Sequence, residues 1–407
     1  MTYPKGLSIH TIWDEIAYLL DSTKDLLSLA LTCRTFKDLI IPDHIEYRHI
    51  RCSIRRQDVW KHLESRPRLT RGVRFLELLV EYSNVAPSNL LPGILESRYK
   101  GSKMNKTSDN ILIVPKRSRR SEVTKENLDR FLGSLSHMTL LKGFIWVHQC
   151  IPPQGIVDIS SVLTNTAHCL EGLSLIREYY DQSQYENLSI WKLSGLKKVI
   201  LEYPCPASIH MILYSCPYIE DLSLSNVDSD LFQDIIQYAN WNNLRRLSIC
   251  ETYSEEGPIF TRDYFTLITS FFDRHPNLES LEILDVGSAM PALPSSCLPK
   301  LHSICSDNKW LIPTFLSRET ISRFVHLDCP IDNIDPENFP KLDKLETLSF
   351  EVPTILPKSF ISFLSKAPNL KKLNVDIWNP EKFYDVVSAD HASPAQRETL
   401  TSHHDRV

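Results

Sequence analysis

The sequence predicts an α/β protein in which a short three-helix segment precedes a curved solenoid with parallel strands inside and helices outside. Three observations predict this fold. Apolar residues recur at helical spacing within the first 45 positions. Further along, one short leucine-rich string recurs many times. The segments between its copies again carry apolar residues three and four positions apart, as in amphipathic helices.

The composition indicates a folded protein that binds other proteins. The 407 residues are 42% hydrophobic and 23% charged, and the net charge is -5. Such a chain has no global positive field to attract nucleic acid or an anionic membrane, so we expect neither as a partner. No signal peptide or membrane-length apolar run is visible. Ten cysteines without a C-x-x-C pair suit reduced thiols, and we expect a cytoplasmic or nuclear protein.

The N-terminal helices are predicted residue by residue. From Ile12, apolar side chains at i, i+4, i+7 and i+8 form one helical stripe. Ser22 followed by Asp25 has the spacing of a capping box and predicts the start of a second helix. A third should end near Ile41, because the following Pro42 disfavours helical geometry in that residue. Three such helices bury little core by themselves, so their spare apolar surface needs a neighbour.

The same residues resemble the F-box family, whose motif joins an apolar helix, an acidic turn, a leucine-rich helix, a cysteine and an aromatic residue. The matching positions are Leu7, Ile12, Ile16, Leu19, Asp21, Asp25, Leu26, Leu29, Cys33, Phe36 and Leu39. Ser8 stands where the family usually has proline, and His10 where it usually has an acidic residue. The resemblance covers roughly residues 6–45, and we interpret Cys33 as buried packing.

The resemblance implies a partner. In the F-box family this motif binds the Skp-type adaptor of cullin ubiquitin ligases, so we expect the same adaptor, and through it a cullin, here. The residues expected to bind the adaptor are Leu7, Ser8, Ile12, Ile16, Leu19, Leu26, Leu29, Cys33 and Phe36. The alternative is that these helices only cap the exposed end of the solenoid, as repeat arrays require.

The recurring string has the form Leu-x-x-Leu-x-Leu, with apolar variants. Clear copies are LKGFIW (141–146), LEGLSL (170–175), LKKVIL (196–201), IEDLSL (219–224), LRRLSI (244–249), LESLEI (278–283), LETLSF (345–350) and LKKLNV (370–375). Two fainter copies lie near 298–303 and 322–327. Most steps fall within the roughly 20 to 29 residues of leucine-rich repeats. Each repeat is expected to hold one short strand and one helix, stacked on its neighbours.

The strand pattern predicts a binding face. Since side chains alternate along a strand, the middle residue of each string should point out of the concave face. These residues are Ile145, Ser174, Ile200, Ser223, Ser248, Glu282, Ser349 and Asn374. Small polar side chains suit the docking of a target peptide or protein edge, although plain solvated surface is the alternative for each of them.

Sequence patterns also suggest domain bounds. We expect the helical segment at 1–50, the solenoid at 51–385 and a disordered polar tail at 386–407. Residues 98–120 carry eight basic residues against one acidic and should form a disordered insertion at about 98–122. The cluster from Lys116 to Arg120 is either a nuclear import signal or an exposed basic loop.

No catalytic motif, metal-ligand set or cofactor-binding loop is recognisable. Cys205, His210 and Cys216 lack a fourth ligand for zinc. We therefore expect no enzyme activity, no metal and no cofactor, and interpret the chain as a substrate-recruiting subunit of a cullin ubiquitin ligase. The alternatives are an interaction scaffold without ligase coupling and an enzyme with an unrecognised site.

Overall fold

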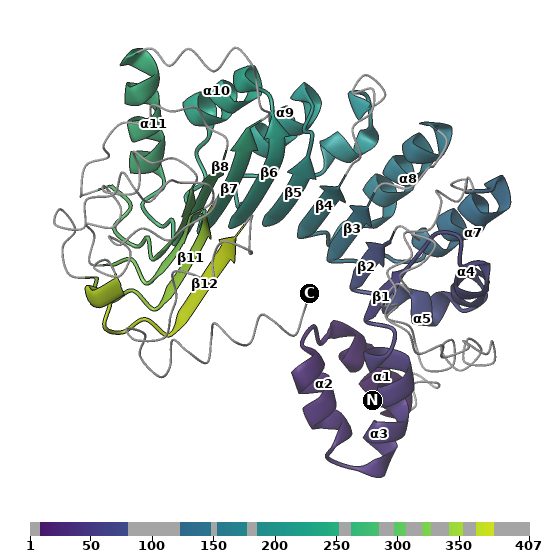
Figure 1. Cartoon of the computed structure of the whole chain (residues 1–407). Helices are drawn as coiled ribbons and strands as arrows, with labels where there is room; N and C mark the ends of the chain where they lie inside the picture. Colours follow the sequence, from purple (N-terminus) through teal and green to yellow (C-terminus); the bar gives the residue numbers. More distant parts are fainter. Residues whose placement is uncertain are drawn as a thin grey trace, which may run out of the picture. The chain divides into compact units, whose positions relative to one another are not determined.

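The computed structural model describes residues 9–79, 123–147, 153–176, 185–251, 262–284, 297–306, 320–326, 342–352 and 364–377. The chain divides into two compact units, Met1–Ile200 and Leu201–Val407. Each unit consists of parallel strands with helices beside them, and the first also carries a group of N-terminal helices (Figure 1). The predicted insertion at 98–122 and the predicted tail at 386–407 lie outside the described residues.

The N-terminal helices, here called the head (9–45), begin where the sequence predicts. They are α1 (Ile9–Leu19), α2 (Thr23–Ala30), α3 (Arg34–Ile40) and the five-residue π-helix η1 (Ile41–Ile45). The Ser22 hydroxyl accepts the Asp25 backbone N–H at 3.2 Å, which confirms the predicted N-cap of α2. α3 ends at Ile40, as the stop predicted near Ile41 requires, but one further helical turn follows it. Ile41 keeps helical backbone angles and the chain continues as η1, where proline occupies the first turn and its missing N–H costs no helical hydrogen bond.

The rest of the first unit alternates strands and helices. Its elements are β1 (His49–Cys52), α4 (Gln57–Glu64), α5 (Pro67–Arg71), β2 (Phe75–Leu78), α7 (Lys125–Leu135), β3 (Gly143–Val147), α8 (Pro153–Thr166), β4 (Gly172–Ile176), the 3₁₀ helix η3 (Ser189–Lys192) and β5 (Lys198–Glu202). β1 to β4 pair in chain order and all in parallel. β5 follows β4 in the sheet, and its last two residues belong to the second unit.

In the described residues the second unit repeats this alternation from α9 to β8, and β9 to β12 follow as strands. Its elements are α9 (Pro206–Ser215), β6 (Asp221–Val227), α10 (Ser229–Tyr238), β7 (Arg246–Glu251), α11 (Arg262–Arg274), β8 (Ser280–Leu284), β9 (Ser303–Ser306), β10 (Arg323–His326), β11 (Thr347–Val352) and β12 (Lys372–Ile377). Every consecutive pair from β6 to β12 is parallel. The predicted α/β fold of parallel strands flanked by helices, of leucine-rich-repeat type, is confirmed.

Each strand contributes alternate side chains to a continuous core. In the first unit Leu76 is in register with Phe144, and Phe144 with Leu173, and all three are buried. In the second unit Leu222, Leu247, Leu281 and Ile304 form the equivalent buried row. One strand alone buries only one of its faces, so the stability of the core depends on stacking neighbouring repeats.

A buried histidine links two neighbouring repeats of the second unit. His275, just past α11, donates a hydrogen bond from Nδ1 to the Phe271 carbonyl at 2.6 Å. Its Nε2 accepts the backbone N–H of Trp241 at 3.1 Å, and the Trp241 indole N–H donates to the Ile212 carbonyl at 3.2 Å. His275 and Trp241 are both 1% exposed. The backbone between α10 and β7 is therefore hydrogen-bonded to the helix of the next repeat.

The first two repeats are absent from the predicted set of strings. β1 and β2 occur in stretches without a leucine at the first position of the string, where Tyr47 and Val73 stand instead, both buried. Strands β9 and β10 do lie near the two faint copies, but their register places the strings at 301–306 and 321–326, three residues later and one residue earlier than predicted. Within the described residues, none of the helices combines the length and the apolar character needed to cross a bilayer.

Candidate protein-binding surfaces

The head has a small core of its own. Ala17, Leu26, Ala30 and Ile40 are at most 2% exposed and pack together. The Trp13 and Phe36 rings meet edge to face, with centroids 4.8 Å apart, and link α1 to α3. This core fixes the helices relative to one another but leaves much of their apolar surface uncovered.

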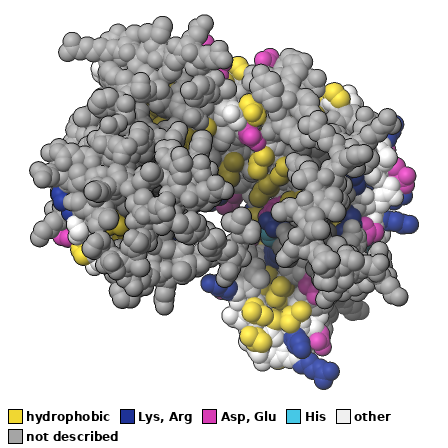
Figure 2. Space-filling view, viewed as in Figure 1, with side chains coloured by type: hydrophobic (Ala, Val, Ile, Leu, Met, Phe, Trp, Pro, Cys, Tyr) yellow, Lys and Arg dark blue, Asp and Glu magenta, His cyan; other side chains and the backbone are white. Residues whose placement is uncertain are grey.

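Several large apolar side chains of the head face solvent. The exposed fractions are 47% for Ile12, 77% for Leu19, 45% for Leu27 and 75% for Leu31. Figure 2 shows hydrophobic side chains gathered on the head, which lies at the bottom of the view. Scattered exposed leucines are ordinary on a protein surface, but four large apolar side chains exposed on so small a helical unit provide surface of the kind that binds partners. These four side chains are here called the apolar patch.

The residues expected to bind the adaptor have several different environments. Ile12 and Leu19 belong to the apolar patch. Ile16 is half-buried, and Leu29 and Phe36 are half-buried against the core of the head. Leu7 and Ser8 lie outside the described residues. The structure therefore brings part of the predicted set to one surface.

Two members of that set are corrected. Leu26 is fully buried, because it faces the other helices of the head, and cannot contact a partner while the head is folded. Cys33, expected to be buried, is exposed, because it occupies the extended N-cap position between α2 and α3 rather than a helical core position. Sequence reasoning missed Leu27 and Leu31, which the apolar spacing of α2 alone could not separate from core positions.

An ionic network around the buried carboxylate of Asp14 attaches the head to the first repeats. The Asp14 carboxylate, on α1, accepts a hydrogen bond from His44 Nε2 at 2.9 Å and also binds Arg68 of α5. Burial raises the pKa of Asp14, but the hydrogen bonds and charges of Arg68 and His44 outweigh it and hold the pKa below its usual value. Burial, only partly offset by Asp14, lowers the pKa of His44. Asp14 is thus a buried anion held by the Arg68 guanidinium and the His44 imidazole.

Two arginines of the repeats cap the end of α1. Arg48 donates to the Ala17 carbonyl at 2.6 Å, and Arg74 donates to the Tyr18 carbonyl. Both side chains are almost completely buried, and burial together with the charge of Arg74 lowers the pKa of Arg48 to about 10. Cations at a helix C-terminus satisfy its free carbonyls and favour its dipole. We call Asp14, His44, Arg48, Arg68 and Arg74 the joint.

Surface ion pairs extend the joint toward the next repeat. Asp21, which follows α1, accepts a hydrogen bond from Lys142 at 2.5 Å and contacts Arg74 at 3.4 Å. Lys142 also reaches Glu171 at 3.4 Å. Exposed ion pairs contribute little free energy each. Together with the buried joint, they hold the head in one orientation relative to the first repeats of its unit.

The predicted middle positions of the strands do align. In the second unit Ser223, Ser248 and Glu282 lie in register across β6, β7 and β8, and Ser349 lies beside Asn374 across β11 and β12. The Asn374 amide donates to the Ser349 hydroxyl at 3.1 Å. All five are half-buried, so their polar atoms form a shallow polar row.

In the first unit the same row differs in character. Ile145 is in register with Ser174, and Ile200 occupies the equivalent half-buried position on β5. Ser174 was expected to be accessible but is 5% exposed, because its short side chain lies beside the larger Ile145. In the first unit the row therefore includes two apolar residues, Ile145 and Ile200.

Sequence reasoning missed the beginning of the row. Glu77 on β2 is in register with Ile145, and Arg51 on β1 is in register with Glu77. Glu77 binds Arg51 and also accepts a hydrogen bond from His49 at 2.8 Å. In the second unit Cys305 continues the row beyond Glu282. The apolar pattern Val73, Leu76, Leu78 around Glu77 is the signal that could have identified this repeat.

The described residues show no arrangement suited to a metal ion. Across those ranges no three His, Cys, Asp or Glu side chains come together as ligands. Cys205 and Cys216 are buried at the two ends of α9, whereas His210 is exposed between them.

Comparisons with known proteins assign no family to this chain. No family model matches the chain, and no curated protein matches it significantly. Similar solved structures include the complex of Rad7 and Elc1 in yeast, at 14% identity and a TM-score of 0.41, over 66% of this chain and 76% of that one. A Bacteroides fragilis protein is similar at 13% identity with a TM-score of 0.28, over 60% of this chain and 62% of that one. The Toll–Spätzle complex of Drosophila is similar at 15% identity with a TM-score of 0.27, over 63% of this chain and 34% of that one.

Proposed function

We propose that the chain is a substrate-recruiting F-box subunit of a cullin ubiquitin ligase. In this proposal the head binds a Skp-type adaptor, and through it a cullin. The row formed by the middle residues of the strands binds a target protein. The chain itself catalyses nothing and acts in the cytoplasm or nucleus. Its effect is to raise the local concentration of target lysines near the ubiquitin carrier.

The apolar patch is the observation that carries the proposal. Ile12, Leu19, Leu27 and Leu31 are exposed, and all four lie within the stretch that resembles the F-box pattern. Burying such side chains against a partner would contribute about 1.5 to 3 kcal/mol for each fully buried one. The joint supports the same function, because a fixed head would hold the adaptor in a constant relation to the first repeats of its own unit.

The test measures binding of purified Skp-type adaptor by isothermal titration calorimetry. Ile12→Asp places a charge within the apolar patch and should weaken adaptor binding at least tenfold, since about 1.4 kcal/mol corresponds to that factor. Val157→Asp is the matched control. Val157 lies on α8, is an aliphatic residue and is 46% exposed, against 47% for Ile12.

The outcomes are distinct. Adaptor binding that survives Val157→Asp and is lost in Ile12→Asp supports the ligase proposal. Equal binding by all three proteins, or no binding by the unmodified chain, contradicts it. Circular dichroism of both variants checks that the head remains folded.

A second candidate is a scaffold without ligase coupling, whose head only caps the repeats. Two observations favour it: Ser8 and His10 depart from the F-box pattern, and the joint attaches the head to α5 and β2 as a cap would be attached. It predicts that the unmodified chain does not bind the adaptor but still binds its target.

A further inference from the structure

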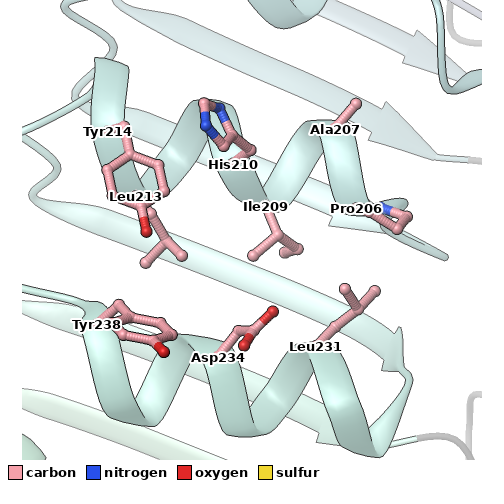
Figure 3. Close-up of a pocket in the computed structure, with 9 residues that line it drawn as sticks. All are labelled: Pro206, Ala207, Ile209, His210, Leu213, Tyr214, Leu231, Asp234 and Tyr238. Atoms are coloured by element: carbon pink, nitrogen blue, oxygen red, sulfur yellow. The ribbon is translucent and has the colours of Figure 1, made fainter.

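A groove lies between two helices of the second unit, outside the head and the strand row. Its walls come from α9 and α10, and its volume is about 440 Å³. Figure 3 shows Ile209 and Leu213 of α9 extending toward Leu231 and Asp234 of α10. The size is near the lower end of the roughly 300 to 1,000 Å³ typical of small-ligand pockets. It suits one or two side chains of a partner.

Aromatic rings border the groove. Tyr214 of α9 is 62% exposed and Tyr238 of α10 is 52% exposed. The Tyr214 ring also lies 4.6 Å from the His210 ring, centroid to centroid. Large rings left this open on a repeat surface offer apolar contact area and electron-rich faces at low entropic cost.

Asp234 is the one acidic residue among those that line the groove, which also include His210. Asp234 points into it from α10, and no lysine or arginine is among the residues that line it. Within the part of the chain that the structure describes, the Asp234 carboxylate has no hydrogen-bond or ion-pair partner. A carboxylate beside two tyrosine rings favours a cation, because the rings and the carboxylate both attract positive charge. An anionic peptide or lipid surface would be repelled.

We propose that this groove binds a lysine or arginine side chain from an extended segment of a partner protein. The cation lies against Asp234 and the Tyr214 and Tyr238 rings, while an apolar neighbour in the same segment contacts Leu213 and Leu231. This binding site is independent of adaptor binding by the head, because its residues belong to the second unit. The partner is a basic, partly apolar segment, whichever protein supplies it.

The test uses three fluorescein-labelled peptides, Gly-Leu-Ser-X-Ser-Leu-Gly, with lysine, arginine or norleucine at X. Fluorescence anisotropy with the full chain at low ionic strength should give tighter binding for the two cationic peptides than for the norleucine peptide, by about three- to tenfold. The comparison of lysine with arginine identifies the preferred cation. Because the contact is charge-assisted, added salt should reduce the difference.

Two variants locate the site. Asp234→Asn and Tyr238→Ala should each bring the cationic peptides to the affinity of the norleucine peptide. Asp230→Asn is the control, because Asp230 is also an exposed carboxylate of α10 but does not line the groove. Equal binding of all three peptides, absence of binding, or an equal effect of Asp230→Asn and Asp234→Asn would overturn the proposal. Loss of adaptor binding in Ile12→Asp leaves this result unchanged.

Discussion

The buried histidine between two repeats makes the stability of the second unit depend on pH. His275 accepts the Trp241 backbone N–H at Nε2 and can do so only while it is neutral. Burial lowers its pKa to about 4, and the hydrogen bond to the Phe271 carbonyl offsets this only in part. We predict that His275→Leu removes this pH dependence along with the hydrogen bond.

The magnitude follows from the shifted pKa. An unfolded histidine has a pKa of about 6.5, so between about pH 6.5 and 4 the unfolded chain binds a proton that the folded chain does not. Stability is therefore complete above that window and falls as the pH decreases through it. The loss is about 2 kcal/mol by pH 5 and about 3 kcal/mol in full. At pH 7, His275→Leu leaves the Trp241 N–H without its acceptor and costs about 1 to 3 kcal/mol.

The assay is urea unfolding followed by circular dichroism at pH 7, 6 and 5. At pH 7 the free energy of unfolding should be larger for the unmodified chain than for His275→Leu. The difference between the two should decrease by about 2 kcal/mol at pH 5. Other titrating groups affect both proteins equally and cancel in the difference. If the two stability profiles run parallel from pH 7 to pH 5, His275 does not carry this linkage.

Three further predictions concern the first unit. Ser22→Ala removes the hydroxyl that caps α2 and should destabilise the head by about 1 kcal/mol, measured as a lower midpoint for loss of adaptor binding or helicity on heating. Phe131→Ala should lower the free energy of unfolding in urea by about 3 to 5 kcal/mol, because the fully buried Phe131 ring packs against Trp60 with ring centroids 4.9 Å apart. A decrease below about 1 kcal/mol would contradict that packing. Cys33 should react with iodoacetamide in the native chain well before the buried Cys52, as peptide mass spectrometry can show, and the reverse order would mean that Cys33 is covered.

The repeats were predictable because their pattern is local. In a string such as residues 219–224, Ile219, Leu222 and Leu224 must face one core and Ser223 the other side, whatever the neighbouring repeats contain. The register of Ser223 with Ser248 confirms that interpretation. Where the first leucine is replaced, as by Tyr47 before β1, the same physical pattern remains but a search for leucine misses it.

The joint could not be predicted in the same way. Arg48 and Arg74 read as ordinary surface cations in the sequence, yet they cap carbonyls 31 and 56 positions away. Local periodicity carries no information about such distant pairs. Asp14 gave no hint either, because at helical spacing it lies opposite the apolar stripe that begins at Ile12. The target-binding role of the strand row stays a prediction.

The joint also determines how this protein could be cut and recombined. A fragment ending at residue 50 keeps α1 but loses Arg68 and Arg74, so the Asp14 carboxylate and the Tyr18 carbonyl would lose those donors. Grafting the N-terminal helices onto another array therefore requires transferring the chain through β2, to Leu78, as one piece. The transplantable module of this protein is larger than its helices, and the first two strands belong to it.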